Sequence, residues 1–369
     1  MRGTRPPDAR AIRAVFDQNE PGTVGLEEEV LLLDPSTFQP VPVAAEVVRA
    51  AAHPQIKTEL PACQVEIITE PHRTAAAAAR ELAAGRARLI DTCGGDARPA
   101  AAAVHPHLQQ PVAVSANERS RAMGSQYGIV AERQVVGALQ VHVAVGDADA
   151  ALAVYNALRG LLPELAALAS AAPIHEGRDT GLSSVRPLIC AQLPRQGVPP
   201  VLRSWEAYAD ELAWGADTGW VPEAGRWWWE LRPHVVHGTL EVRVPDVQPT
   251  IEAARAVASL VQALVLHLVD RHRDGEALGA PSSWRIAENR WSALRDGTHG
   301  EMADLVTGET MATTSRLHQL IDASEPFAGG GLDGARTMVG CNSADQLRRA
   351  GPERSARWLA EVFAPDGEG

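Results

Sequence analysis

The stretch Val24-Gly25-Leu26-Glu27-Glu28-Glu29-Val30-Leu31-Leu32-Leu33-Asp34 decides the fold of this chain, because it sets three consecutive carboxylates inside an apolar run. Its Val- and Leu-rich composition, closed by a Pro-Ser turn, predicts a strand over residues 24–33. Side chains alternate between the faces of a strand, so Glu27 and Glu29 share one face and Glu28 takes the other.

Two carboxylates on one face of a strand need compensation. They lie about 7 Å apart, and at an effective dielectric near 20 they repel each other by about 2 kcal/mol before any desolvation cost. A cation beside the pair removes that penalty, and hard carboxylate oxygens suit Mg²⁺ and the phosphates it accompanies. The alternative interpretation is a solvated edge strand whose charges face water.

The overall composition narrows the class of protein. Hydrophobic residues make up 45% and charged residues 22% of the 369, as in ordinary soluble globular proteins. This length allows one large domain or two smaller ones. The formal net charge of −12 argues against nucleic acid and anionic membranes as partners.

Cysteine usage and apolar segments predict a cytoplasmic protein. The four cysteines are scattered without C-x-x-C spacing, which favours reduced thiols over disulfides or a zinc ribbon. The N-terminal residues lack the apolar core of a signal peptide. The longest apolar stretch, residues 256–269, is too short to span a bilayer.

The chain is expected to contain a flexible N-terminal arm (1–20), a single domain (21–325) and a C-terminal extension with a short helix (326–369). Three further strands are predicted over 64–69, 138–145 and 238–244, with a short one near 100–104. Helices are predicted over 43–52, 74–91, 149–172 with a kink at Gly160 and Pro163, 204–214, 250–271, 284–296 and 300–321. Residues 173–203 are irregular and are expected to form a lid or binding segment. Strands scattered among helices predict an α+β fold with a largely antiparallel sheet.

Each of the four main strands carries a polar pair on one face, and the opposite faces are mostly Val or Ile. The polar pairs are Glu27 and Glu29, Gln64 and Glu66, Gln140 and His142, and Glu241 and Arg243. This pattern predicts a sheet with one face under helices and one polar face lining a cavity. Such a floor would bind two or more Mg²⁺ or Mn²⁺ ions and present them to a triphosphate, with Arg243 neutralising a transferred phosphoryl group.

Other motifs leave alternatives open. His105-Pro106-His107 is similar to the H-x-H of metallohydrolases, but Pro fits a central strand badly, so a loop lining the site is the other interpretation. The Gly-bounded segment 177–181, followed by Arg186, suits a carboxylate clamp or a plain surface loop. The chain has no Walker A, G-x-G-x-x-G or G-x-S-x-G sequence.

Taken in order, these motifs resemble those of the carboxylate–amine ligases of the second glutamate–cysteine ligase type, whose fold is related to the catalytic domain of glutamine synthetase. The resemblance implies a curved sheet with a polar active-site face and runs from about residue 22 to 300. Its landmarks are the stretches 24–29, 64–66 with Thr69, 105–107, 139–143, 176–181 with Arg186, 193–199, 229–233, 237–244 with Asp246, and 288–291.

The resemblance implies ATP- and Mg²⁺-dependent amide formation, with Mn²⁺ as the alternative cation, in a homo-oligomer such as a dimer. In the type reaction the γ-carboxylate of glutamate attacks the γ-phosphate of ATP, and the amine of cysteine then displaces phosphate from the acyl phosphate. By position, five residues correspond to metal ligands: Glu27, Glu29, Glu66, His142 and Glu241. Arg243 and Arg232 correspond to phosphate contacts. Substrate contacts are assigned to Arg186, Asp179, Thr180, Gln140 and His107.

Several positions depart from the family pattern. They are Ala171, Ala172, Ile174, His175, Leu182, Val185, Glu230 and Pro245, and aromatic residues are lost at some of them. Because such losses reshape a pocket without touching phosphoryl chemistry, either the amino acid or the amine is expected to differ from glutamate and cysteine.

Three hypotheses follow from the sequence. The leading one is an ATP-dependent ligase that joins an amino acid to an amine. The second is an ATP-binding protein of the same fold without turnover, motivated by the altered 171–185 segment. The third is a metal-dependent hydrolase that would hold Zn²⁺ with His105, His107 and His142 and act without ATP.

Overall fold

The computed structural model describes residues 6–108 and 111–364. Strand β1 (Val24–Leu33) has the bounds expected from the sequence and lies inside a seven-stranded sheet ordered β2-β3-β1-β5-β9-β8, with β4 also paired to β1. Each of these pairs is antiparallel, which confirms the predicted fold class. The other strands of this sheet are β2 (Ile56–Thr58), β3 (Gln64–Ile68), β4 (Arg98–Ala100), β5 (Leu139–Ala144), β8 (Leu231–His234) and β9 (Thr239–Val242). Strands β6 (Ile174–His175) and β7 (Arg178–Asp179) form a separate two-stranded sheet.

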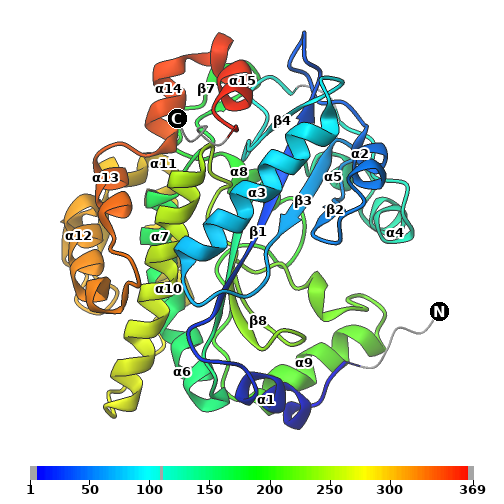
Figure 1. The fold of residues 1–369 in the computed structure, drawn as a ribbon. Helices are drawn as coiled ribbons and strands as arrows, with labels where there is room; N and C mark the ends of the chain where they lie inside the picture. The colour runs from blue at the N-terminus through cyan, green and yellow to red at the C-terminus, as the bar shows by residue number, and fades with distance from the viewer. Residues whose placement is uncertain (1–5, 109–110, 365–369) are drawn as a thin grey trace.

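Helices α3 (Ala75–Cys93) and α10 (Ile251–Arg273) cross one face of the sheet (Figure 1). Leu26, Val30 and Val141 are fully buried beneath them, as the alternation along the strands requires. Helix α10 is long and apolar enough to cross a membrane, but 61% of its most apolar window is buried in this core. It therefore has the character of a core helix.

The remaining helices surround this unit. They are α1 (Ala9–Asp17), α2 (Ala44–Ala51), α4 (Glu118–Tyr127), α5 (Ile129–Glu132), α6 (Ala148–Leu158), α7 (Leu162–Leu168), α8 (Arg186–Cys190), α9 (Trp205–Asp217), α11 (Ser283–Asp296), α12 (Thr313–Ser324), α13 (Asp333–Gly340), α14 (Ser343–Ala350) and α15 (Pro352–Glu361). Short 3-10 turns lie at Arg159–Leu161, Ala224–Arg226, Gly297–His299 and Glu325–Phe327. The helix expected over 149–172 is broken as predicted, with Pro163 in the first turn of α7.

The structure differs from the loose arm expected before residue 20. Helix α1 is capped by Asp8, whose carboxylate accepts a hydrogen bond from the Ala11 N–H at 2.8 Å. Ile12 and Phe16 are fully buried, and the Phe16 ring lies 4.9 Å from that of Trp205 on α9. A short amphipathic helix thus replaces the arm over residues 9–17, and residues 1–5 lie outside the described part of the chain.

Two other elements also differ from expectation. Residues 301–312 form a hairpin, β10 (Glu301–Ala303) and β11 (Thr310–Ala312), where a helix over 300–321 was expected. The Asp304 side chain accepts hydrogen bonds from two N–H groups of its own turn, which closes the hairpin before α12 begins. The C-terminal extension holds α13, α14 and α15 where one short helix was expected, because Ala335, Val339 and Phe363 are buried in the main core.

Candidate active site

The strand register gathers the predicted polar side chains on one face of the sheet. Residues directly opposite each other in antiparallel strands share a face. Glu29 is opposite Glu66, and Glu27 is opposite Gln140. Further along the sheet, Glu241 stands between His142 on β5 and Arg232 on β8. The polar floor expected from the sequence is therefore present.

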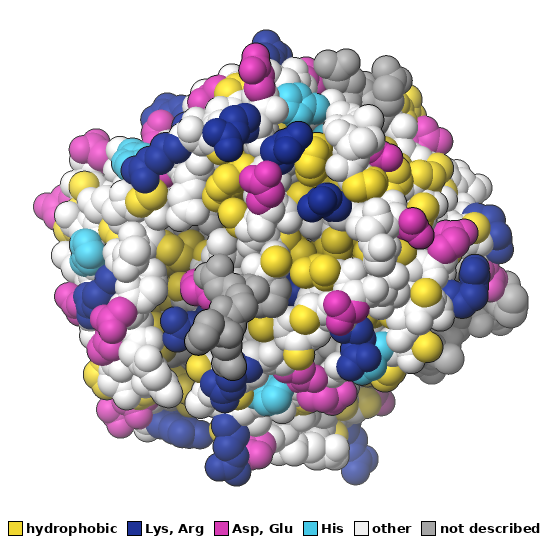
Figure 2. Space-filling model, turned by 45° about the horizontal axis from the view of Figure 1, so that its top comes forward, with side chains coloured by type: hydrophobic (Ala, Val, Ile, Leu, Met, Phe, Trp, Pro, Cys, Tyr) yellow, Lys and Arg dark blue, Asp and Glu magenta, His cyan; other side chains and the backbone are white. Residues whose placement is uncertain are grey.

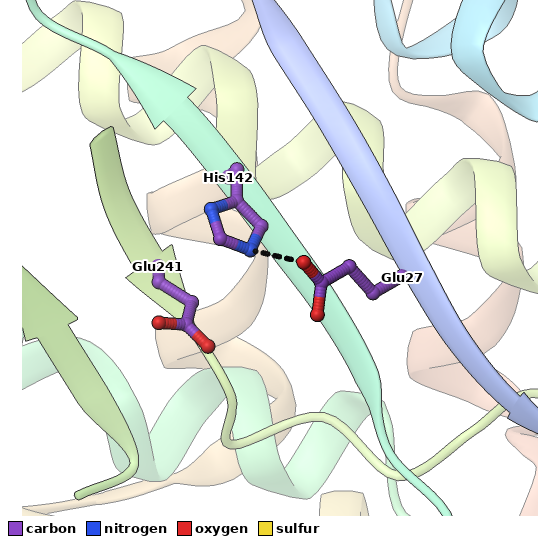
Figure 3. Close-up of side chains that lie close together, drawn as sticks. All are labelled: Glu27, His142 and Glu241. Atoms are coloured by element: carbon purple, nitrogen blue, oxygen red, sulfur yellow. Dashed lines mark ion pairs between the residues drawn. The ribbon is translucent and has the colours of Figure 1, made fainter. Parts of the chain in front are cut away.

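Three of the predicted metal ligands converge at the centre of this floor. One ligand atom from each of Glu27, His142 and Glu241 lies within 4.8 Å of the others. Figure 3 shows the three side chains reaching toward one another from β1, β5 and β9. The imidazole Nε2 of His142 lies 3.3 Å from a Glu27 oxygen, and its Nδ1 is 2.9 Å from the Thr239 hydroxyl.

These three residues fit a divalent cation. The Nε2 atom of His142 is buried without a hydrogen-bond partner, while Thr239 fixes the ring through the other nitrogen. An imidazole oriented in this way, facing carboxylate oxygens, is a ready ligand. Carboxylates suit Mg²⁺ and Mn²⁺ alike, and the added nitrogen ligand favours the softer Mn²⁺.

Opposing charges keep the cluster ionised. Burial works to raise the pKa of Glu27, but the neighbouring His142 imidazole lowers it to about 2. Burial also acts on Glu241, yet the guanidinium groups of Arg232 and Arg243 hold its pKa well below the usual range. Both groups are thus carboxylates at neutral pH, the form that binds metal.

A second acidic group lies beside the first. The Glu29 carboxylate accepts hydrogen bonds from the Ala138 N–H at 2.8 Å and from the Gln140 amide at 3.0 Å. Burial and the charge of Glu59 raise the pKa of Glu29 to about 7. Burial and the carboxylates of Glu59, Glu27 and Glu29 raise the pKa of Glu66 well above its ordinary value. The five predicted metal ligands therefore divide into a trio and this pair, and Glu59 joins the pair.

We expect a divalent cation to displace protons from this second group at neutral pH. With a pKa of about 7, the Glu29 carboxyl is roughly half protonated at pH 7, and a bound cation favours its charged form. Calorimetry of Mn²⁺ binding should give heats that change with the ionisation enthalpy of the buffer. The Glu29→Gln variant should release fewer protons. Equal heats in all buffers would contradict this expectation.

The arginines of the floor differ in how they are held. Arg232 grips Glu241 with two hydrogen bonds, at 2.6 and 3.0 Å, and donates to the Gly225 carbonyl. Arg243 contacts Glu241 and Gln140 through one terminal nitrogen. Arg186, predicted to bind substrate, is paired with Asp246 at 2.6 Å and donates to the Val244 carbonyl. Arg232 and Arg243 are therefore held by side chains of the floor, whereas Arg186 is held by Asp246.

A cavity of about 260 Å³ opens beside the second acidic group. Glu29, Glu59 and Gln64 line one side, and Arg119, Arg186 and Arg243 contribute positive charge. Sequence reasoning missed Glu59 and Arg119. Glu59 follows a strand of three residues, too short for a periodic signal, and Arg119 lies on α4, for which no helix was predicted.

The structure does not bring three predicted substrate contacts into this cavity. Asp179 is ion-paired with Arg348 of α14 at 3.0 Å, and the Thr180 hydroxyl donates to the Pro173 carbonyl. His107 lies 2.8 Å from the Pro352 carbonyl oxygen. Asp179 and His107 thus contact residues of the C-terminal helices α14 and α15, and Thr180 binds the backbone of its own loop, so a substrate role for the three residues stays a prediction.

The structure also does not bring together His105, His107 and His142, the three zinc ligands of the hydrolase hypothesis. His105 is buried with its Nε2 2.8 Å from the Phe38 carbonyl, and burial lowers its pKa to about 4. Within residues 6–108 and 111–364, the one group of three metal-capable side chains whose ligand atoms all lie within 4.8 Å of one another is Glu27, His142 and Glu241. A zinc site built from His105, His107 and His142 has no support in this geometry.

Most departures from the family pattern lie in the core. Ala171, Ala172 and Ile174 are each at most 3% exposed. They line neither the cavity beside Glu29 nor a second one of about 490 Å³ beside Trp227 and Trp229. Of the departing residues, Glu230 lines the first cavity, where it is paired with Arg290 at 2.8 Å. At two of the positions that lack the family's aromatic residue, the side chains present, Ile174 and Val185, are buried.

The surface in Figure 2 mixes acidic and basic side chains over the face shown. On that face the described residues form no continuous basic stripe of the kind that follows a nucleic-acid backbone.

Comparisons with known proteins identify one family of similar sequences. Residues 23–361 match the family model of glutamate–cysteine ligase family 2. The chain is 31% identical over 352 residues to "Putative glutamate–cysteine ligase 2-2" of Mycolicibacterium vanbaalenii, covering 91% of this chain and 93% of the relative. It is 33% identical over 300 residues to "Putative glutamate–cysteine ligase 2-3" of Mycolicibacterium smegmatis, covering 80% and 82%.

Two solved structures share the fold. One is the glutamate–cysteine ligase of Francisella tularensis in complex with AMP, with a TM-score of 0.67, 14% identity, and coverage of 93% of this chain and 89% of that one. The other is a bifunctional glutathione synthetase from Pasteurella multocida, with a TM-score of 0.65, 15% identity, and coverage of 96% and 53%. At such identities the likeness supports the architecture alone.

Proposed function

The chain belongs to glutamate–cysteine ligase family 2 and is a carboxylate–amine ligase, and from this premise we propose that it uses ATP and Mg²⁺ to join an amino acid to an amine. The default substrates are glutamate, through its γ-carboxylate, and cysteine. The observation that carries the proposal is the convergence of Glu27, His142 and Glu241 on one point of the polar floor.

We assign the acidic residues of the floor to cation binding and Arg243 to the phosphoryl group. Glu27, His142 and Glu241 would hold one cation, and Glu29, Glu59 and Glu66 form the acidic group suited to another. When bound, the cations supply Lewis-acid charge that draws the terminal phosphates of ATP onto the floor. Arg243 lines the cavity and reaches Glu241 and Gln140, so it can neutralise charge on the transferred phosphoryl group.

The cavity beside Glu29 is the proposed site for the acid and the amine. The carboxylate of the amino acid would attack the γ-phosphate of ATP to give an acyl phosphate and ADP. The amine would then attack the acyl carbon, form the amide and release phosphate. Arg119 and Arg186 lie on the cavity wall and supply positive charge for carboxylate groups of the substrate. A cytoplasmic location and a homo-oligomeric state are part of the same proposal.

Phosphate release by the purified protein tests this function. Release should require Mg²⁺, ATP, a carboxylic acid and an amine together, and a matrix of amino acids and amines should identify the pair. Release without the amine would instead indicate an ATPase or a partial reaction. Tight MgATP binding with no product across the matrix would favour the binding protein without turnover.

We expect the Glu27→Gln variant to bind Mn²⁺ at least about tenfold more weakly than the wild type, because it removes a charged ligand from the trio. Paramagnetic resonance of free Mn²⁺ measures this directly. Glu46→Gln, which removes an exposed carboxylate on α2, is the matched control and should bind normally. Equal affinity in both variants would place the cation elsewhere.

A further inference from the structure

Lys57 stands apart from every other basic residue of this protein. It is the only lysine in the sequence, among 34 Lys and Arg residues. It lies on β2, and the register places it directly opposite Glu66 of β3. Opposite residues share a face, so Lys57 stands on the polar floor while its neighbour Ile56 is buried on the apolar side.

The ammonium group of Lys57 is exposed and uncommitted. Among the described residues it forms no ion pair and no side-chain hydrogen bond, although Glu66 stands across from it. The other cations of the floor are engaged, since Arg232 and Arg243 both contact Glu241. In the described part of the chain, Lys57 is therefore a basic side chain without an ion pair at the β2 end of the floor.

Lys57 and the trio of Glu27, His142 and Glu241 are spaced as contacts to a phosphate chain would require. Lys57 is level with Glu66 and Glu29 in the register, and Glu27 lies two strands away and two residues further along β1. That separation is about 12 Å at ordinary strand spacing and rise, and the flexible four-carbon stem of Lys57 covers part of it. Arg243 directly follows β9, on the other side of the trio from β2, and contacts Glu241 and Gln140. Anions held at the trio would thus have a cation on each side.

The strand register fixes the side of the sheet on which Lys57 stands. Lys57, Glu66 and Glu29 are opposite one another on β2, β3 and β1. Residues opposite each other share a face, so Lys57 is on the face that carries the trio.

We propose that Lys57 binds the phosphate chain of ATP and contacts its terminal phosphates from the β2 edge of the floor. This inference rests on the proposed ATP-dependent function and adds a specific residue to it. A lysine suits the role because its compact ammonium acts as a movable point charge, whereas a guanidinium prefers fixed planar pairing. An edge-strand lysine that only discourages strand pairing is the competing explanation.

The single lysine makes a direct test available. In the full chain, an amine-selective acetylating reagent can modify only Lys57 and the N-terminal amino group, and mass spectrometry of peptides separates the two. Saturating MgATP should slow acetylation of Lys57 by about tenfold or more, by mass action, and leave the N-terminal amine unchanged. AMP should protect little. Protection of neither amine by MgATP would overturn the proposal.

Substitutions provide the second readout. Lys57→Met should weaken MgATP binding about ten- to hundredfold, the range of a lost charge-assisted hydrogen bond, and leave AMP binding unchanged. Arg49→Met, which removes an exposed charge on neighbouring α2, should bind both nucleotides normally. Normal MgATP binding by Lys57→Met would overturn the inference and leave the proposed function standing. Failure of the wild type to bind MgATP would overturn both.

Discussion

Replacing Arg243 with Met should reduce phosphate release by about a thousandfold or more, the range measured when a transition-state arginine is lost from phosphoryl-transfer enzymes. Arg243 lines the cavity beside Glu29, and its side chain is 19% exposed. It contacts Glu241 and Gln140 through one terminal nitrogen. Its other donors have no hydrogen-bond partner among residues 6–108 and 111–364, so they can meet charge that develops on a phosphoryl group.

Single-turnover phosphate release, with saturating acid and amine, measures this effect. Arg243→Lys keeps the charge without the planar fork and should recover part of the rate. Arg203→Met, on the wall of the second cavity, is the matched control and should keep the wild-type rate. Thermal unfolding and Mn²⁺ binding of each variant exclude a folding or metal defect. A rate within tenfold of wild type for Arg243→Met would contradict the assignment.

The polar floor could be predicted because a strand has a fixed period of two. Once residues 24–33 are a strand, Glu27 and Glu29 must share a face, and the same reasoning places Glu66, His142 and Glu241 on the faces of their own strands. The sequence contains no comparable rule for strand order. That β5 lies between β1 and β9, which makes His142 the centre of the trio, is a tertiary result.

The remaining errors lie where a local turn or a distant partner decides the structure. Asp179 and Thr180 lie in a segment of turns without periodicity, and there a polar side chain can bind the backbone or a distant helix as readily as a substrate. Residues 301–312 have a hairpin turn inside a stretch that also suits a helix. The N-terminal helix was missed because its burial depends on Trp205, nearly 200 residues away in the sequence. Local sequence carried no signal of the distant partners, which are Arg348 for Asp179 and Trp205 for Phe16.

Glu28, on the side of β1 opposite the polar floor, forms a buried ion pair with Arg86, which is distant in the sequence. Its carboxylate is fully buried on the helix side of β1, where Arg86 of α3 binds it with hydrogen bonds of 2.6 and 2.8 Å. The same guanidinium donates to the Gln248 and Pro249 carbonyls and lies 4.5 Å from the Phe363 ring. One ion pair thus joins β1, α3 and the C-terminal segment, directly behind Glu27 and Glu29.

We therefore expect Arg86→Met to destabilise the protein by about 3–5 kcal/mol, because it leaves the Glu28 charge buried without a partner. Urea unfolding should show a lower midpoint. Arg13→Met, which breaks an exposed pair with Asp149, should cost at most about 1 kcal/mol. A loss below about 1 kcal/mol in Arg86→Met would mean that water or another group reaches Glu28.

The double variant Glu28→Leu/Arg86→Met separates stability from function. Replacing both members of a buried pair with apolar residues often restores stability, so the double variant should be more stable than Arg86→Met alone. If the pair also fixes the register of β1, the double variant will bind Mn²⁺ more weakly than the wild type even when its unfolding midpoint is restored. If its Mn²⁺ affinity matches the wild type, the strand pairs of the sheet alone hold Glu27 and Glu29 in place, and the buried ion pair serves stability only.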